Sequence, residues 1–227
     1  MNNALNEMQQ LRLILVKETN FDLTKAEKLY NFIVGNQQKV LDKPVVNINK
    51  SDGIYFILSS SRAIHESLAT DKDKHNSIAI GVKMGDKFAN ITLHDAASSE
   101  DIALCKEDKV PCGSEQFFRR TFNEAMADWN GMASTNDMRD SLNPDINLGE
   151  NEYIPSVAQL HLILLNINEV NKALVEAGGD LMKEAWYWSS TEYNSGVAWY
   201  VYFSNGLTNY DSKYNNVVVR PAVAFEL

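Results

Sequence analysis

The sequence predicts an α+β fold built on an antiparallel sheet, because its segments run in the order helices, strands, two helices, strands. Two stretches carry this prediction. The run IAIGVKM-GD-KFANITL is typical of a hairpin, with Gly85-Asp86 as its two-residue turn. In the run Trp199–Phe203, tyrosines alternate with the more apolar Trp, Val and Phe, as expected of a half-buried strand. Trp199, Val201 and Phe203 should face the core, and Tyr200 and Tyr202 should point the other way.

The first fifty residues predict a small helical element. Leu5, Met8, Leu11 and Leu15 recur at helical spacing within residues 4–17. A second helix should begin at the capping box Thr24–Glu27 and end at Gly35. So short an element cannot bury a robust core of its own. We therefore expect residues 1–50 to attach the chain to a larger assembly or to form a homo-oligomer, and residues 51–227 to form a ligand-binding domain.

Strands follow this element. Val45, Val46 and Ile48 precede an Asp52-Gly53 turn and the strand-like run Ile54–Leu58. Residues 59–75 should form a loop or a short helix, and residues 95–113 a loop. In the hairpin between them, side chains at alternate positions should share one side of the strand: Ile78, Ile80, Val82 and Met84.

Two helical regions come next, and strands close the chain. One helix should begin near Ser114 and end at Asn130-Gly131, with Phe118, Phe122, Ala125 and Trp129 on one stripe. Another should start at Pro155-Ser156, where Ser156–Gln159 is a capping box, and should carry Leu160, Ile163 and Leu164. A further helical stretch should end at Gly178-Gly179. Residues 217–225 predict a closing strand, with Pro221 at an edge or a bulge.

Composition narrows the possible functions. The 227 residues are 44% hydrophobic and 22% charged, which is typical of a globular core. A net charge of -9 without a basic cluster argues against nucleic-acid binding. No apolar stretch is long enough for a transmembrane helix, so we expect no membrane insertion. The first residues make a poor signal peptide, because Glu7 and Arg12 interrupt the apolar run. The protein is therefore expected to act without Sec export, or to have lost a leader.

Catalytic motifs are sparse. Cys105 and Cys112 could close a small disulfide loop, although two reduced thiols are favoured, and their spacing does not fit a metal knuckle. The four histidines are scattered and show no HExxH spacing, and His94-Asp95 is better explained as a surface turn. Ser189, Ser190 and Thr191 lack a GxSxG context, which favours a structural role. We expect no metal and no cofactor.

The segment Tyr193–Asn216 has an unusual composition. Fourteen of its twenty-four residues are Tyr, Asn, Ser or Asp. Antibody contact loops use the same mixture, in which Tyr supplies rigid contact area and Ser and Asn supply adaptable hydrogen bonds. A binding surface is one interpretation of the segment, and an ordinary polar loop that happens to be aromatic is the other.

A family resemblance favours the binding surface. The stretches IPSVAQLHLILLNINEVNKALVEAGG, YWSSTEY, AWYVYFSNG and VVVRPAVAF resemble the C-terminal half of bacterial and phage C-type-lectin-like domains, which share the fold of the formylglycine-generating enzyme. The resemblance covers roughly residues 115–227 and extends less securely back to Ile54. It implies two helices packed on a twisted antiparallel sheet. Within this family, the segment 188–220 is similar to the variable regions of diversity-generating retroelement proteins, such as phage major tropism determinants.

The resemblance divides this segment into two sets. Residues that the family keeps fixed, here called the framework residues, are Trp188, Ser189, Ser190, Ala198, Trp199, Phe203, Gly206, Arg220 and Pro221. Residues that it implies to be diversified and ligand-binding, here called the candidate variable residues, are Gly196, Val197, Tyr200, Tyr202, Leu207, Asn209, Tyr210, Asp211, Tyr214, Asn215 and Asn216, with Val217 as a further position. We expect Tyr200, Tyr202, Asn209, Tyr210, Asp211 and Tyr214 to form one solvent-facing patch.

The resemblance implies a noncatalytic protein that binds a protein or glycan receptor, on a phage tail or displayed on a bacterial surface. The alternative is a fixed-specificity carbohydrate-binding module or an enzyme on the same fold. Formylglycine-generating activity needs a pair of cysteines late in the domain, and no cysteine follows Cys112. No EPN, QPD or WND motif marks a calcium-dependent sugar site. The nearest string, Asp128-Trp129-Asn130, falls within a predicted helix.

Overall fold

The computed structural model describes residues 51–59, 62–97, 101–106 and 112–224. The chain divides into two compact units, Met1–Val45 and Val46–Leu227, and all of the described residues belong to the second. This unit has helices and antiparallel sheets, as the predicted α+β class requires. The helices predicted within residues 4–17 and 24–35, and the strand residues 45–48, lie outside the described residues.

A four-stranded antiparallel sheet is formed by β1 (Gly53–Ser59), β2 (Arg62–His65), β3 (Ala79–Met84) and β4 (Lys87–Thr92), in the order β2-β1-β3-β4. Met84 pairs with Lys87 across the predicted two-residue turn, and Gly85 has a φ of 59°, which favours glycine. Ile80 and Val82 are buried, whereas Ile78 and Met84 at the two ends of the predicted row are exposed.

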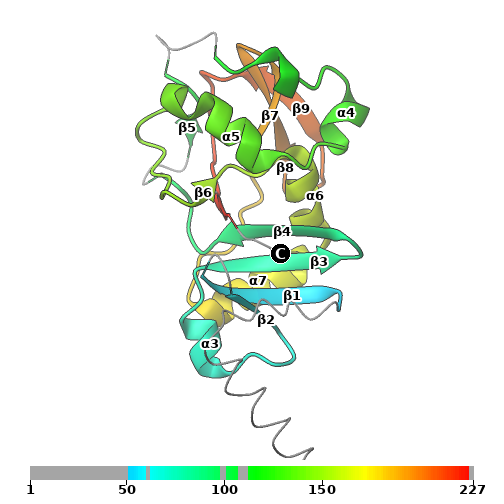
Figure 1. The fold of residues 1–227 in the computed structure, drawn as a ribbon, viewed down its shortest axis with the longest axis vertical. Helices are drawn as coiled ribbons and strands as arrows, with labels where there is room; N and C mark the ends of the chain where they lie inside the picture. The colour runs from blue at the N-terminus through cyan, green and yellow to red at the C-terminus, as the bar shows by residue number, and fades with distance from the viewer. Residues whose placement is uncertain (1–50, 60–61, 98–100, 107–111, 225–227) are drawn as a thin grey trace, which may run out of the picture. The chain divides into compact units, whose positions relative to one another are not determined.

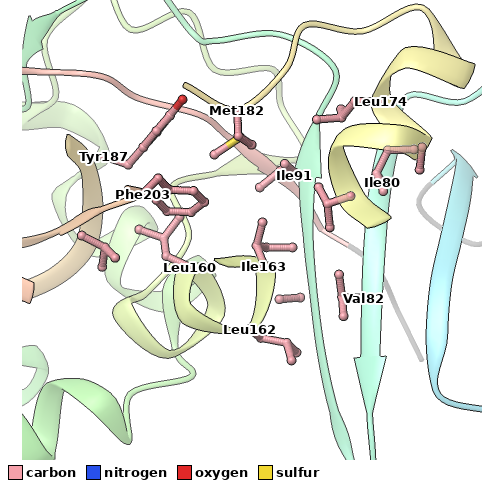
Figure 2. Close-up of a cluster of buried hydrophobic side chains, with 14 of the residues drawn as sticks. Ile80, Val82, Ile91, Leu160, Leu162, Ile163, Leu174, Met182, Tyr187 and Phe203 are labelled. Atoms are coloured by element: carbon pink, nitrogen blue, oxygen red, sulfur yellow. The ribbon is translucent and has the colours of Figure 1, made fainter. Parts of the chain in front are cut away.

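Two consecutive helices, α6 (Val157–Leu165) and α7 (Ile167–Ala177), pack on one face of this sheet. The predicted capping box starts α6: Ser156 accepts a hydrogen bond from the Gln159 amide, and Gln159 reaches back to the Ser156 amide. Gly178, in the left-handed conformation, ends α7 as predicted. Leu160 and Ile163 of α6, Leu174 of α7, and Ile80 and Ile91 of the sheet belong to the main core, and Figure 2 shows Ile163 toward Ile91 and Leu160 beside Phe203.

A second, three-stranded sheet lies toward the C-terminal end of the chain (Figure 1). It contains β7 (Trp186–Asn194), β8 (Val197–Tyr202) and β9 (Thr208–Ser212) in that order, all antiparallel. Two pairs of short strands complete the unit: β5 (Ile102–Ala103) with β10 (Asn216–Val217), and β6 (Glu152–Tyr153) with β11 (Ala222–Val223). The predicted closing strand is thus two short strands, and Pro221 stands directly before the second.

The structure corrects the helix predicted for residues 114–130. That stretch is divided into a 3-10 turn, η2 (Glu115–Phe117), and a short helix, α4 (Phe122–Met126), which Thr121 starts with its own capping box. Gly131 begins the next helix, α5 (Gly131–Met138), and a second 3-10 turn, η3 (Arg139–Ser141), follows it. The apolar stripe suggested one long helix, but the Thr121 cap and the extended residue Phe118 break it.

Regular structure also occurs in the segment predicted as a loop or a short helix and in one predicted loop. Residues 59–75 include the strand β2 and a short helix, α3 (Asp71–His75), capped by Thr70. Residues 95–113 include β5. No helix in the described ranges is both long and apolar enough to span a membrane.

Candidate binding face

The sheet β7-β8-β9 positions the predicted site, because its register decides which side each residue faces. Tyr200 of β8 pairs with Trp188 of β7 and with Asn209 of β9. Directly opposed residues of antiparallel strands project from the same side of a sheet. Trp188, Tyr200 and Asn209 therefore share one side, and their neighbours along each strand share the other.

One side of this sheet, here called the Trp199 face, is apolar. Trp199, Val201 and Phe203 are all buried and belong to the main core that includes α6. The indole of Trp199 also donates a hydrogen bond of 2.8 Å to the backbone oxygen of Arg119. The alternation predicted for this strand is confirmed: these three residues form the core side, and the tyrosines between them are less buried.

The opposite side, here called the Tyr200 face, carries the buried Trp188 and Ala198, which belong to a second core. Its less buried residues are Trp186, Tyr200, Tyr202, Asn209 and Asp211. The Trp186 ring stacks on Tyr202 at 4.9 Å and meets Tyr200 edge-on at 4.4 Å between ring centroids. Beneath Tyr200 lies the buried Trp188 ring, at 5.4 Å. Burial, and then the charge of Asp211, raise the pKa of the Tyr200 hydroxyl, which therefore stays a neutral hydrogen-bonding group.

The expectation of a single patch is wrong for Tyr210. This residue pairs with Trp199, so its ring lies on the Trp199 face, 5.0 Å from the Trp199 ring centroid. It stacks at 4.3 Å between ring centroids on Tyr193, which is not among the candidate variable residues. Tyr210 remains 43% exposed and lies at the open edge of that face. The aromatic side chains thus form two surfaces, one on each side of β8 and β9.

The turn between β9 and β10 supplies further exposed residues. Tyr214, Asn215 and Asn216 are exposed, whereas Lys213 beside them is fully buried. Lys213 contacts the carboxylate of Glu192 in an ion pair that is also fully buried. Burial raises the pKa of Glu192 to about 7, and Lys213 opposes that rise. Sequence reasoning missed this pair, since charged residues are ordinarily exposed.

The candidate variable residues and the framework residues differ in burial. None of the eleven candidate variable residues is buried; the exposed ones are Leu207, Asn209, Tyr210, Tyr214, Asn215 and Asn216. Eight framework residues are buried: Trp188, Ser189, Ser190, Ala198, Trp199, Phe203, Arg220 and Pro221. Gly206, the ninth, is partly buried and has a φ of 77°, which only glycine adopts readily.

Two polar framework residues, Ser189 and Arg220, make internal side-chain hydrogen bonds. The hydroxyl of Ser189 donates to the Trp199 backbone oxygen at 2.7 Å. Next to the framework, the Thr191 hydroxyl donates to Asp128 at 2.8 Å. Asp128 is buried and lies in the connection between α4 and α5. The prediction that Asp128–Asn130 is helical is therefore wrong. The WSST stretch therefore fixes β7 to its neighbours, which agrees with a structural role.

The histidine and cysteine residues considered for catalysis have these contacts. His94 is exposed and pairs with Asp180 at 2.8 Å, and Asp95 forms a 2.7 Å ion pair with the buried Arg220. Among the residues that the structure describes, no group of three or more His, Cys, Asp and Glu side chains is placed to hold a metal ion. Cys105 and Cys112 are both buried, with their sulfur atoms 3.0 Å apart.

Comparisons with known proteins add no family assignment. No family model matches the chain, and no curated protein matches it.

Proposed function

We propose that this chain is a noncatalytic binding protein whose ligand-contacting surface is formed by the candidate variable residues. The observation that carries the proposal is that the framework residues and the candidate variable residues within 188–221 differ in burial. Positions assigned to the framework are buried or conformationally constrained, and none of the positions assigned to binding is buried.

This division has a physical consequence. Substitutions at exposed positions away from caps and buried networks usually change stability by less than about 0.5 kcal/mol, whereas large core residues cost several times more. Many combinations of side chains can therefore occupy the six exposed candidate variable positions on one fold. The present combination offers the two aromatic surfaces with amide and carboxylate groups beside them, and exposed aromatic patches are typical of binding sites.

We further propose that the fold is C-type-lectin-like. Supporting features are the two consecutive helices α6 and α7 on an antiparallel sheet, and the separate sheet β7-β8-β9 that carries the site. The chain segments of the predicted resemblance, from the capped start of α6 to β11, include all of these elements except the first sheet.

We propose that a retroelement diversifies this surface, which would explain why positions that accept many side chains are rich in Tyr and Asn. On this proposal the protein recognises a protein or glycan receptor, on a phage virion or at a bacterial surface, and residues 1–50 attach it there.

Sequencing the gene's surroundings tests this directly. We expect a reverse-transcriptase gene nearby and a near-copy of the coding sequence for residues 188–220 that differs only at adenines. A genome without these elements would contradict diversification and favour the fixed-specificity module or enzyme.

A further inference from the structure

Four chemically active side chains meet next to the turns of the candidate site. Cys105, Cys112, Glu192 and Lys213 are 1%, 6%, 0% and 0% exposed. The two sulfur atoms are 3.0 Å apart, and the Lys213 ammonium is 3.4 Å from the Cys112 sulfur. None of these residues belongs to the candidate variable set. A chain that only needed a packed core would gain little from a buried cation beside two thiols.

The positions of the sulfur atoms favour bond formation. A disulfide holds its sulfurs about 2.05 Å apart, so these two need to approach by only about 1 Å. Both cysteines are free in the structure. The pair is therefore poised for oxidation without a rearrangement of the fold.

The surroundings make the two thiols unequal. Lys213 contacts Cys112. The hydrogen bond from Cys105, and then the charge of Lys213, lower the pKa of Cys112 to about 6, against the opposing effects of burial and of Asp137. The same hydrogen bond, together with burial, raises the pKa of Cys105. Thiolates are the nucleophilic form of cysteine, so Cys112 is the reactive member.

We propose that Cys105 and Cys112 form a peroxide-reactive thiol pair, in which Cys112 is oxidised first and Cys105 then converts it to a disulfide. Hydrogen peroxide is small enough to reach a side chain that is only slightly exposed.

The chemistry proceeds in two balanced steps. The Cys112 thiolate attacks one oxygen of hydrogen peroxide, the O–O bond breaks, and hydroxide leaves, which gives a sulfenic acid. The Cys105 sulfur then attacks the Cys112 sulfur, and the S–O bond breaks. The departing oxygen leaves as water with the Cys105 proton. In total, two thiols and one peroxide give one disulfide and two waters.

Backbone hydrogen bonds join the two cysteines to the turn between β7 and β8 and to the turn after β9. The Cys112 amide donates to the Ser195 oxygen at 2.9 Å, between β7 and β8, and the Cys105 amide donates to the Lys213 oxygen at 3.2 Å, after β9. Lys213 itself donates to the Ser195 oxygen at 3.3 Å. A disulfide would thus crosslink the chain at the point where the two turns are held together.

Mass spectrometry of the full chain tests the proposal. The reduced protein is treated with hydrogen peroxide, quenched with catalase, unfolded and weighed without reductant. We expect the wild type to lose the mass of two hydrogen atoms, with Cys105 and Cys112 linked in one peptide pair. Wild-type protein that keeps both free thiols would overturn the proposal.

Reciprocal serine variants test the order of events. In Cys105→Ser, peroxide should leave a sulfenic acid on Cys112 that dimedone labels, and Cys112→Ser should label at least about tenfold less. Equal or reversed labelling would contradict the assignment. Should either variant fail to fold, limiting iodoacetamide at pH 7 on the wild type replaces this test. Cys112 should then be alkylated about tenfold faster than Cys105, and the opposite preference would refute the proposal.

Discussion

Trp199 of β8 and Tyr210 of β9 are paired across the strands, with ring centroids 5.0 Å apart and ring planes at 75°. This contact puts Tyr210 on the side of the sheet opposite Tyr200. The candidate site is therefore a sheet edge with aromatic residues on both sides, joined by the exposed turn that carries Tyr214.

Replacing Trp199 and Tyr200 in turn tests the assignment of the two faces. Trp199→Ala should lower the free energy of unfolding by roughly 3–5 kcal/mol, because it leaves a cavity in the main core. Tyr200→Ala should cost far less, since Tyr200 is only partly buried. Denaturant unfolding of both variants measures the difference. Equal costs, or the reverse order, would show that the facing of β8 is wrong.

The stacked rings of Tyr193 and Tyr210 should be energetically coupled. Aromatic pairs contribute about 0.5–1.5 kcal/mol beyond the area that they bury. A double-mutant cycle with Tyr193→Ala, Tyr210→Ala and the double variant should give a coupling energy in that range. The matched cycle of Tyr193 with Tyr200, which lies on the other face, should give a value near zero. If Tyr193 were instead coupled to Tyr200 and not to Tyr210, the assignment of Tyr193 and Tyr210 to the Trp199 face would be wrong.

His161 should make stability depend on pH. It lies on α6, and its Nε2 atom is 2.7 Å from the Thr208 hydroxyl of β9. Burial lowers its pKa below the ordinary value of 6.5, so the unfolded chain binds a proton more readily than the folded one. The stability that depends on neutral His161 is thus present above pH 6.5 and is lost as the pH falls through the lowered pKa. Thermal melts of wild type and His161→Gln between pH 5 and 8 measure this. Identical pH profiles for the two proteins would contradict it.

Binding should not need the thiols. The double variant Cys105→Ser, Cys112→Ser should fold and retain its affinity for a ligand selected on the wild-type protein under reducing conditions. Both residues are buried and lie outside the candidate variable set. A folded double variant that no longer binds would show that the cysteines take part in function, and would reopen an enzymatic role.

Local signals predicted much of the fold. The capping box at Ser156, the glycine at the end of α7 and the Gly85-Asp86 turn depend on a few neighbouring residues, and the structure contains each of them. Alternation along β8 was also sufficient to orient Trp199 and Tyr200.

Longer-range features could not be obtained in this way. The side that Tyr210 faces depends on the pairing of β9 with β8, which one strand alone does not reveal. The burial of Lys213 depends on Glu192, which belongs to β7. Trp186 was missed in part for the same reason: alternation puts it on the side of Trp188, but only the pairing of β7 with β8 places that side beside Tyr200.

The central claim is that the candidate variable residues can change while the framework holds the fold. A library that randomises the eleven candidate variable residues tests it most directly, beside a control library that randomises Trp188, Ser190, Ala198, Trp199, Phe203 and Arg220. Protease resistance of displayed library members measures the folded fraction, and panning against unrelated proteins and glycans measures binding. We expect most members of the first library to fold and some to bind new targets, and most members of the control library to be cleaved. Similar folded fractions in the two libraries, or a first library that is largely unfolded, would contradict the claim.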